Sequence, residues 1–551
     1  MTARGESTAW PWIGLAAFAV FGASLLLHGP NLRAWTFWPD AIEYLLIGNS
    51  WANGTGFVDP VQWFHIPGAG TVVPAFAVRA PVVPFLIGVA LSLGATVLTV
   101  VKLHAIWSAA ATGLMVLGAA RLARLPAATA AALWVALFPS WRSLSHLPMT
   151  ETTAVAAMAL VLLSLRSAAR SVTGAVVCAL LTVLGWLTRP NLAGMALAVF
   201  VALLTTAEPG RRLQNRPAWV YLLTFGACFL VIREIAVAWT GFAPYSGYAV
   251  LGLLVDKGAF RFYAPEIPDG LLDLLAQKPL AMLSAAFVNT KGMLRELFLG
   301  GKFGWVGWIG LPGVAWCLWG GLRHRLERRF TALCSLGFAA GVALTLSYWD
   351  ATRYPLLTAV TAAFCAAALL DDLAELTSRR LAAAGRRVVG FAPAAVLLAA
   401  AWFVVPSLDR AWAKTGWWFR DTQTIDPVLA RRDVSLRAVC ASLPPDVLVA
   451  ASPAWGISFW CGNPTIALPI DLERPNIRRR MVRERRPGYV VYRKKARARQ
   501  RSRAKWLDKV ASTRHFDVYE VRASRKPATW NAPPPVGCAG RPAACLEGVE
   551  R

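Results

Sequence analysis

Charged residues are scarce in this sequence. They make up 16% of its 551 residues, whereas soluble globular proteins carry about 25%. Hydrophobic residues reach 56%. The shortage of charge excludes a chain built only of soluble domains. It indicates that lipid surrounds much of the protein and that the length is divided into spanning segments of roughly 20 residues.

Acidic residues are scarcer than basic residues. There are 30 Asp and Glu against 57 Lys and Arg, which gives a net charge of +27. Such an excess can serve nucleic-acid binding, or it can belong to the arginine-rich loops of a membrane protein that contacts anionic lipids. The long hydrophobic runs favour the second interpretation. We therefore expect membrane lipids as partners and no nucleic acid.

Two kinds of motif are missing. No Gly-rich nucleotide loop or Walker motif is present, which disfavours a nucleotide-linked substrate. None of the nine cysteines forms a Cys-x-x-Cys pair, so neither a zinc site nor a thioredoxin-like site is expected. Four cysteines lie in the polar C-terminal region, where an oxidising compartment would permit disulfides. We expect one between Cys440 and Cys461 and a second between Cys538 and Cys545.

Apolar segments dominate the first 406 residues and predict a polytopic helical protein with eleven to thirteen transmembrane helices. The first segment is expected to be a retained helix rather than a secretory signal peptide, because no small-x-small cleavage site clearly closes it. The twelve segments are 10–28, 81–97, 101–120, 126–140, 149–165, 173–188, 191–206, 218–239, 303–320, 330–348, 356–370 and 388–406.

The loops between these segments predict the orientation. Arginine-rich loops are normally cytoplasmic, and five short ones occur, at Arg121/Arg124, Arg166/Arg170, Arg211/Arg212/Arg216, Arg323/Arg325/Arg328/Arg329 and Arg379/Arg380/Arg386/Arg387. Longer loops with fewer basic residues cover 29–79 and 241–300. Counting back from a cytoplasmic loop at 371–387 puts residues 407–551 and the loop 241–300 outside. Counting forward from a cytoplasmic N-terminus puts the loop 29–79 outside as well. The two counts disagree by one crossing within 80–148.

The C-terminal region changes character. Short apolar runs at 447–451, 489–492 and 516–521, separated by turn signals, predict strands. The expected organisation is a transmembrane domain over 1–406, an extracytoplasmic α/β domain over 407–525 and a loosely ordered tail over 526–551. A basic stretch over 474–505 is either a solvated face or a contact for anionic lipid or an acidic cell-envelope polymer.

The first long loop contains a candidate base. Pro39 suits the first position of a helix, and Asp40 and Glu43, three residues apart, would share one face of it. Acids in a first turn can simply complement the helix dipole. Placed just outside a membrane, they can also serve as a base for a membrane-borne substrate. The same loop ends in Arg79-Ala80-Pro81-Val82-Val83-Pro84.

Three further charged residues lie at the ends of apolar segments. Glu151 follows Pro148-Met149-Thr150 and is either a helix N-terminal charge or a functional acid, since carboxylates near lipid usually have a partner or a role. Arg189 and Arg353 can mark helix ends. Each is alone in a predicted outer turn, where arginine is disfavoured, which favours anion binding for Arg353 and leaves Arg189 open.

The order of these motifs resembles the GT-C superfamily of polyprenyl-phosphate-sugar-dependent glycosyltransferases. The likeness is to the bacterial branch related to protein O-mannosyltransferases and the lipid A aminoarabinose transferase. It rests on Asp40-x-x-Glu43-Tyr44, Gly-x-Gly-Phe at 54–57, Arg-x-Pro-x-x-Pro at 79–84 and the residues around Glu151, Thr-Arg-Pro at 188–190 and Arg-Tyr-Pro at 353–355. An α/β domain after the last span also fits.

The resemblance implies a function and a site. A sugar would pass from a polyprenyl-phosphate carrier to an extracytoplasmic acceptor, either a lipid or a cell-envelope glycan or protein, with inversion at the anomeric carbon. Asp40 would be the base, with Glu43 and Glu151 as further catalytic acids, and Glu151 would help to place the acceptor or a bound divalent cation. The lipid phosphate would be held by Arg353, Tyr354, Arg189 and Arg79. The implied location is the plasma or inner membrane, with the site facing outward.

Two other functions are compatible with this composition. About twelve spans suit a secondary transporter, but transporters of this size usually show two similar halves, and no internal repeat is evident. A membrane scaffold that binds anionic lipid or polymer would use the basic domain. It would leave the pattern of Asp40, Glu151 and Arg353 unexplained.

The predicted orientation can be tested by cysteine labelling. In a background without other free cysteines, Gly68→Cys and Ser452→Cys should react with a membrane-impermeant reagent from the same side, because both loops are predicted to be outside. Arg212→Cys, in an arginine-rich loop, is the control and should react only from the opposite side. Labelling of the first two positions from opposite sides would contradict the orientation.

Overall fold

The computed structural model describes the greater part of the chain. The described residues are 10–27, 39–63, 73–77, 79–145, 147–240, 244–245, 276, 279–299, 303, 306–319, 326–345, 353–383, 392–402, 427–451, 454–467, 486–494 and 507–522. Contacts divide the chain into two compact units. Unit 1 joins Met1–Gly29, Leu103–Ile235 and Met282–Phe419, and unit 2 joins Pro30–Lys102, Ala236–Ala281 and Arg420–Arg551.

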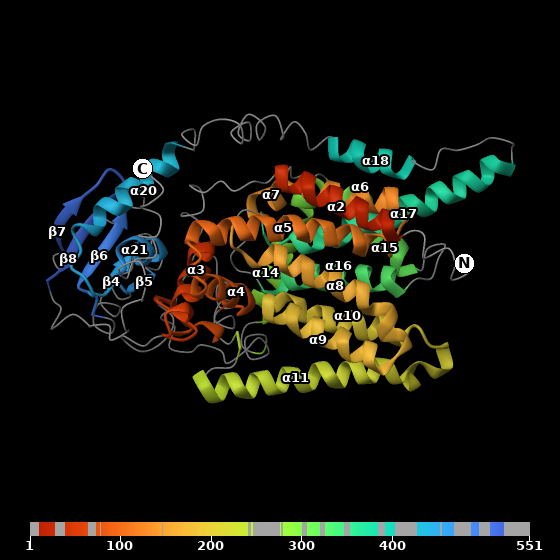
Figure 1. Ribbon diagram of the computed structural model, residues 1–551, viewed down its shortest axis with the longest axis horizontal. Helices are drawn as coiled ribbons and strands as arrows, with labels where there is room; N and C mark the ends of the chain where they lie inside the picture. Colours follow the sequence, from red (N-terminus) through yellow and green to blue (C-terminus); the bar gives the residue numbers. More distant parts are fainter. Residues whose placement is uncertain are drawn as a thin grey trace. The chain divides into compact units, whose positions relative to one another are not determined.

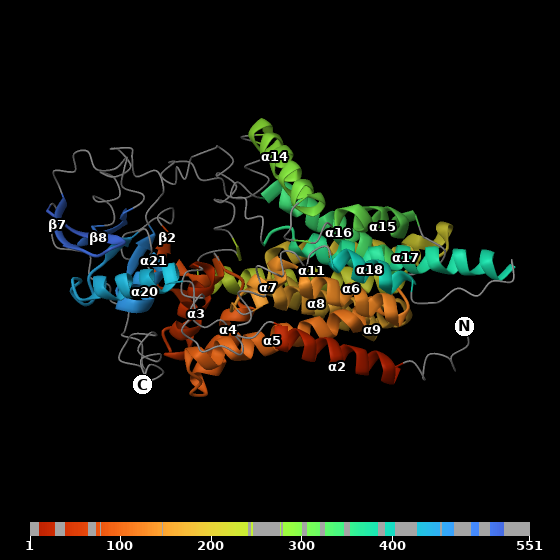
Figure 2. The same cartoon turned by 90° about the horizontal axis from the view of Figure 1, so that it is seen from above.

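Unit 1 is helical throughout its described part, and most of its helices run roughly along one direction (Figures 1 and 2). Its helices are α2 (Trp10–Leu27), α5 (Val97–Ala119), α6 (Leu125–Leu137), α7 (Pro139–Ser145), α8 (Thr150–Arg170), α9 (Val172–Thr188), η3 (Pro190–Leu192), α10 (Ala193–Leu204), η4 (Pro209–Gln214), α11 (Arg216–Thr240), α14 (Pro279–Phe298), α15 (Gly307–Trp319), α16 (Leu326–Thr345), α17 (Leu356–Ala383) and α18 (Ala392–Trp402). The first residues of α5 and α14 and the last of α11 are assigned to unit 2.

Several helices have the length and composition of membrane spans. Within the described residues, four satisfy both criteria, at Thr99–Ala119, Thr150–Arg170, Arg216–Trp239 and Leu356–Arg380. Shorter apolar helices lie at Trp10–Leu26, Val82–Ser92, Leu125–Leu137, Val172–Thr188 and Pro190–Leu204. The predicted class, a polytopic helical membrane protein with a small C-terminal α/β region, is confirmed.

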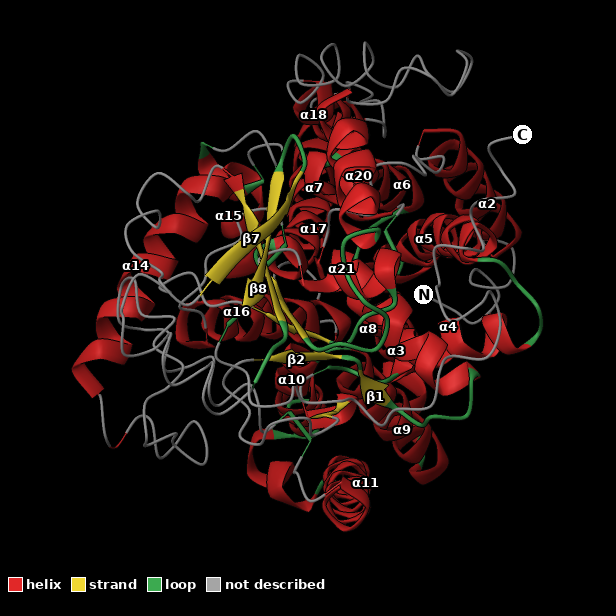
Figure 3. Ribbon diagram, turned by 90° about the vertical axis from the view of Figure 1, so that its left-hand side faces the viewer, coloured by secondary structure: helices red, strands yellow, loops and turns green. Residues whose placement is uncertain are grey.

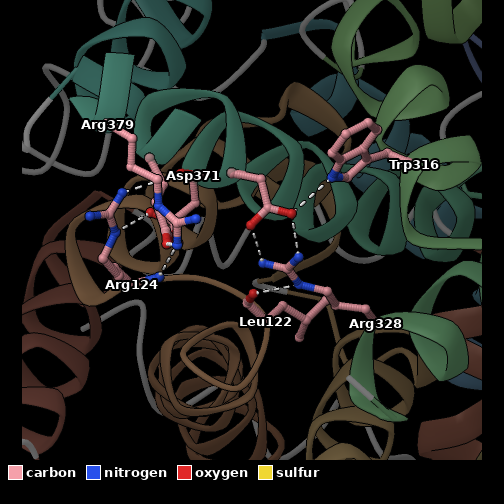
Figure 4. Close-up of polar contacts among 8 residues, drawn as sticks. Leu122, Arg124, Trp316, Arg328, Asp371 and Arg379 are labelled. Carbon is pink, nitrogen blue, oxygen red and sulfur yellow. Dashed lines mark hydrogen bonds and ion pairs between the residues drawn. The ribbon is translucent and has the colours of Figure 1, made fainter. Parts of the chain in front are cut away.

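Ion pairs link the start of α16 and the turn before α6 to the interior of α17 in unit 1 (Figure 4). Arg328 and Asp372 form a two-pronged pair, with Nη1 to Oδ2 at 2.6 Å and Nη2 to Oδ1 at 3.0 Å, and both side chains are almost fully buried. Arg328 Nε also donates to the Leu122 carbonyl, and Trp316 Nε1 donates to Asp372. These bonds fasten α16 to α17, α15 and the end of α5, because a buried charge is stable only with its partner.

Further pairs lie at the same end of these helices. Arg124 Nε contacts Asp371 Oδ1 at 2.6 Å, and Arg166 Nε contacts Glu327 Oε1 at 2.5 Å. The arginines come from three of the predicted cytoplasmic loops, so the structure gathers those loops at one end of unit 1. Glu151, in the first turn of α8, lies fifteen residues before Arg166. At about 1.5 Å per residue this is roughly 22 Å along the helix.

Unit 2 contains a sheet that joins distant parts of the sequence (Figure 3). Its strands are β2 (Val61–Trp63), β4 (Val449–Ala451), β5 (Thr465–Ala467), β6 (Tyr489–Arg493), β7 (Leu507–Ser512) and β8 (Phe516–Val521). The order is β2-β5-β4-β6-β8-β7, with parallel pairing from β2 to β6 and antiparallel pairing of β8 with β6 and β7. The three predicted strands are confirmed as β4, β6 and β8.

Strand β2 comes from the first loop and forms the edge of the C-terminal sheet. Val61 is aligned with Thr465, and Trp63 with Ala467, in parallel register. Two helices accompany the sheet, α20 (Pro427–Cys440) and α21 (Ala454–Cys461). The disulfide Cys440–Cys461 links their ends, with Cα atoms 4.9 Å apart. The predicted boundary at residue 407 remains a prediction, but the C-terminal sheet does not consist of C-terminal residues alone.

The first long loop and the helix that follows it form another part of unit 2. It comprises α3 (Pro39–Ala52), β1 (Val58–Asp59), β3 (Val73–Pro74), η2 (Ala75–Ala77) and α4 (Val82–Ser92), with β1 antiparallel to β3. Helices α3 and α4 meet at two glycines. A Cβ at Gly48 would lie 2.6 Å from Ile87 Cγ2, and one at Gly88 would lie 2.6 Å from the Trp51 ring. This close approach requires glycine at both positions.

Helix α4 is shorter than the predicted segment 81–97. It ends at Ser92, and Gly94 follows with φ of 85°, a helix-ending conformation that glycine favours. Eleven residues extend about 16 Å, roughly half the hydrocarbon thickness. We interpret α4 as part of the predicted outer loop rather than as a crossing. With that assignment the two counts of crossings agree, and eleven segments remain as candidate spans.

Some predicted features fall outside the described residues. These include the proposed Cys538–Cys545 disulfide, the tail 526–551 and most of the basic stretch 474–505.

The Arg328–Asp372 pair generates a stability prediction. Arg328→Leu should lower the free energy of unfolding by about 3–5 kcal/mol, because it leaves a buried carboxylate without a partner. The double variant Arg328→Leu with Asp372→Leu should recover most of this loss, since two apolar side chains need no compensation. Thermal unfolding of the detergent-purified protein measures both.

Arg379→Ala is the matched control, because its pair with Glu375 is more exposed and should contribute no more than about 1 kcal/mol. A double variant as unstable as the sum of its two single variants would contradict the account.

Candidate functional site

Asp40, Glu43 and Arg79 form a charged cluster in unit 2. Asp40 lies in the first turn of α3, and Glu43 lies three residues later on the same face. Arg79 follows η2, and its Nη2 donates to both acids, to Asp40 Oδ1 at 2.9 Å and to Glu43 Oε2 at 2.5 Å. The guanidinium also lies 5.8 Å from the centre of the Tyr44 ring. The sequence motifs at 40–44 and 79–84 therefore meet in one place.

Burial separates the two acids of this cluster. The Glu43 side chain is fully buried, whereas 19% of the Asp40 side chain is exposed. Arg79 is 9% exposed and lies between them. Glu43 is thus held inside the protein, and Asp40 is the acid that an outside molecule can reach. Arg79 was expected to bind a lipid phosphate. Here it contacts two carboxylates, and the phosphate contact stays a prediction.

A third acid, Asp59, belongs to the same cluster and was missed from the sequence. It ends β1, is fully buried, and accepts a hydrogen bond from the backbone N–H of Val61 at 2.9 Å. Burial raises the pKa of Asp59 well above its ordinary value, and its hydrogen-bonding neighbour Glu43 raises it further. The indication of this role in the sequence was weak, because Asp59 simply follows a Gly-x-Gly turn at 54–56 and ends a strand of two residues.

A second cluster lies in unit 1 around Glu151. Arg189 Nη1 and Arg353 Nε both contact Glu151 Oε1, each at 2.7 Å. Glu151 starts α8, Arg189 follows the last residue of α9, and Arg353 precedes α17. Tyr354 places its ring 5.9 Å from the Arg353 guanidinium. Three segments that are distant in the sequence thus bring their charges together.

In this second cluster two guanidinium groups contact one carboxylate. Glu151 is fully buried, and the side chains of Arg189 and Arg353 are 8% and 10% exposed. Both arginines share one carboxylate oxygen. Within the described part of the chain, the other oxygen, Oε2, has no hydrogen-bond partner. Buried guanidinium groups attract anions, and phosphate suits their planar fork of donors.

Side chains of α5 support the start of α8. His104 Nε2 lies 3.5 Å from the Met149 N–H and 3.4 Å from Thr152 Oγ1, and Trp107 Nε1 donates to Thr153 Oγ1 at 3.0 Å. Both side chains lie inside an apolar segment, where sequence patterns alone gave no reason to select them. They fix the helix turn that carries Glu151.

The predicted site residues thus form two groups, one in each unit. Asp40, Glu43 and Arg79 belong to the first, and Glu151, Arg189, Arg353 and Tyr354 to the second. Among the described residues, no group of three or more His, Cys, Asp or Glu side chains is arranged to hold a metal ion. The divalent cation stays a prediction.

The fold is similar to two solved membrane enzymes. One is the oligosaccharyltransferase AglB from Archaeoglobus fulgidus, in complex with an inhibitory peptide and a dolichol-phosphate, with a TM-score of 0.53, 15% identity, and coverage of 88% of this chain and 69% of AglB. The other is ArnT from Cupriavidus metallidurans bound to undecaprenyl phosphate, with a TM-score of 0.51, 15% identity, and coverage of 95% and 100%. Both belong to the GT-C superfamily.

The chain therefore has the GT-C fold, as the order of its motifs predicted. At 15% identity the likeness establishes the fold and no more. No protein-family model matches the sequence, and no curated protein is significantly similar to it.

The Glu151 cluster can be tested through stability. Glu151→Gln should lower the free energy of unfolding by about 3–5 kcal/mol, because it removes the buried carboxylate that two buried arginines contact. Glu234→Gln is the matched control. Its pair with Arg233 is exposed, and its loss should change stability by no more than about 1 kcal/mol. Equal thermal unfolding of the two variants would show that the Glu151 contacts do not stabilise unit 1.

Proposed function

We propose that the protein is a membrane glycosyltransferase that transfers a sugar from a polyprenyl-phosphate carrier to an acceptor outside the cytoplasm, with inversion at the anomeric carbon. Asp40 is the base of this reaction. Arg353 and Arg189 hold the lipid phosphate, and Tyr354 supports Arg353. The acceptor is a lipid or a cell-envelope glycan or protein, and the protein resides in the plasma or inner membrane.

The observation that carries the proposal is the pair of buried arginines at Glu151, on a fold shared with two polyprenyl-phosphate-bound structures. AglB was solved with dolichol-phosphate and ArnT with undecaprenyl phosphate. A polyprenyl phosphate offers a long apolar tail to lipid and a compact anion to the protein. Apolar helices and a pair of buried arginines match those two parts.

The arginines suit the leaving group. As the bond between the anomeric carbon and the phosphate oxygen breaks, its electron pair stays with the phosphate, and negative charge grows on the phosphate oxygens. Arginine can bind two such oxygens at once through charge-assisted hydrogen bonds. Donors already in position cost no reorganisation when this charge develops. Glu151 is the internal anion that holds both arginines in place before the lipid phosphate arrives.

Asp40 suits the attacking side. Its partial exposure leaves it accessible, and its contact with Arg79 favours the ionised form of a carboxyl group. It accepts the proton of an acceptor hydroxyl while that oxygen forms a bond to the anomeric carbon. Attack on the face opposite the departing phosphate inverts the centre. The products are the glycosylated acceptor and the free polyprenyl phosphate.

Substitution of the base is the direct test. Asp40→Asn keeps the size and hydrogen-bonding capacity of the side chain but cannot accept the proton, so the rate should fall by on the order of 10²–10⁴. The measurement is sugar transfer from a polyprenyl-phosphate donor by purified protein. Asp508→Asn, in an exposed ion pair with Arg522, is the control and should transfer at the wild-type rate. Wild-type transfer by Asp40→Asn would remove Asp40 from the mechanism.

A further inference from the structure

Helix α14 differs in direction from the other long helices of unit 1, to which its residues from Met282 onward belong. Figure 3 looks along the main direction of the helices and shows α11 end-on, whereas α14 is seen from the side. Figure 2 shows α14 at a steep angle to α8 and α17. Although α14 has 20 residues, it is not among the candidate spans within the described residues. It has the length of a span without the direction or composition of one.

A hydrogen bond to α16 sets the level of α14 along unit 1. Asn289 Nδ2 donates to the Ala343 carbonyl at 3.3 Å, in the last turn of α16. Glu327, which pairs with an arginine of a predicted cytoplasmic loop, lies in the first turn. Sixteen residues separate Glu327 from Ala343, which is roughly 24 Å along a helix. Because this length approaches the hydrocarbon thickness of a bilayer, α14 meets α16 near one membrane surface, at the end opposite those ion pairs.

One face of α14 is buried and fixes the rotation of the helix about its axis. Asn289, Met293 and Leu297 follow one another at intervals of four residues, so they share this face, and none is more than 5% exposed. At the C-terminal end, Trp308 Nε1 donates to the Phe298 carbonyl at 2.9 Å, and the two rings meet edge to face with centres 5.0 Å apart. The remaining faces of α14 are therefore directed away from these contacts.

An apolar stripe lies beside the buried face of α14. It consists of Leu283, Phe287 and Leu294, whose exposed fractions are 63%, 72% and 38%. At about 100° per residue the three side chains lie within about 40° of one another around the helix axis. Large apolar side chains exposed in one stripe indicate contact with lipid or with another apolar surface.

Two basic residues form an edge on the far side of the apolar stripe. Lys291 and Arg295 are both exposed, and their spacing of four residues places them on the same side of the helix. The acid of α14, Glu296, is less exposed and lies about 100° beyond Arg295 around the axis. The circumference of α14 thus presents in order a buried face, an apolar stripe and this basic edge.

We propose that α14 lies in the membrane–water interface and binds anionic phospholipid there. The apolar stripe enters the upper part of the acyl chains, and Lys291 and Arg295 contact the headgroup phosphates. Amphipathic helices with basic and large apolar residues take this position, and long basic side chains reach the headgroups from below. Anionic lipids are preferred because a zwitterionic headgroup carries a cation of its own. The inference is independent of sugar transfer and uses none of the residues of the two charged clusters.

Quenching by brominated lipids tests which lipid touches the stripe. In a background without other free cysteines, Leu283→Cys carries a bimane fluorophore, and the full-length protein is placed in nanodiscs of equal phosphatidylcholine and phosphatidylglycerol. Bromine is placed on the acyl chains of one lipid or the other. Brominated phosphatidylglycerol should quench more strongly, since each basic residue favours the anionic lipid by up to about fivefold. With Lys291→Gln and Arg295→Gln together, the two lipids should quench equally.

Leu180→Cys is the matched control, because Leu180 is exposed in the middle of the apolar helix α9. Its label should be quenched equally by the two lipids with and without the basic edge, which also shows that the bundle stays folded. Bromines near the headgroup should quench the label at Leu283 best, and bromines near the chain ends the label at Leu180.

Three results would overturn the proposal. Equal quenching by the two lipids at Leu283, with Lys291 and Arg295 present, would show that α14 does not select anionic lipid. An absence of quenching by either lipid would show that protein covers the stripe. Strongest quenching at Leu283 by bromines near the chain ends would show that α14 enters the bilayer as a span.

Discussion

A charged side chain that is buried on folding needs a partner of opposite charge, or it must become neutral. Buried ion pairs that meet this requirement connect distant segments in both units. In unit 1, Arg328 is satisfied by Asp372, and two arginines converge on Glu151. In unit 2, one guanidinium contacts two acids directly. Since unpaired buried charges cost several kcal/mol each, these contacts fix which helix ends can meet.

The buried ion pairs differ in whether they fasten helices together or contain candidate site residues. The Arg328–Asp372 pair is balanced and two-pronged, which suits a fastening between helices. The candidate site residues form one cluster with two arginines at a single carboxylate and another with two acids at a single arginine. Sugar transfer from a lipid phosphate needs both: a positive site for the departing phosphate and an ionised acid for the arriving hydroxyl.

Local sequence patterns predicted many of the helices and strands. Contacts between residues far apart in the sequence could not be predicted in this way. Short apolar runs between turn signals predicted β4, β6 and β8, and the order of short motifs predicted the GT-C fold. The strand at Val61 could not be predicted, because its partner Thr465 lies some four hundred residues away. The resemblance assigned Arg79 to the lipid phosphate, whereas the structure shows it in contact with the acids of α3. Gly94 could have ended the predicted segment 81–97, but apolar residues on both sides of it concealed the break.

The central claim is that a polyprenyl-phosphate sugar is the donor. The most direct measurement incorporates the purified protein into vesicles of native lipid extract with an envelope fraction as acceptor, and follows sugar-bearing and free polyprenyl phosphates by mass spectrometry. The account predicts that the sugar-bearing form declines and the free polyprenyl phosphate accumulates relative to protein-free vesicles. An unchanged ratio in lipid shown to contain these donors, with acceptor present, would contradict it.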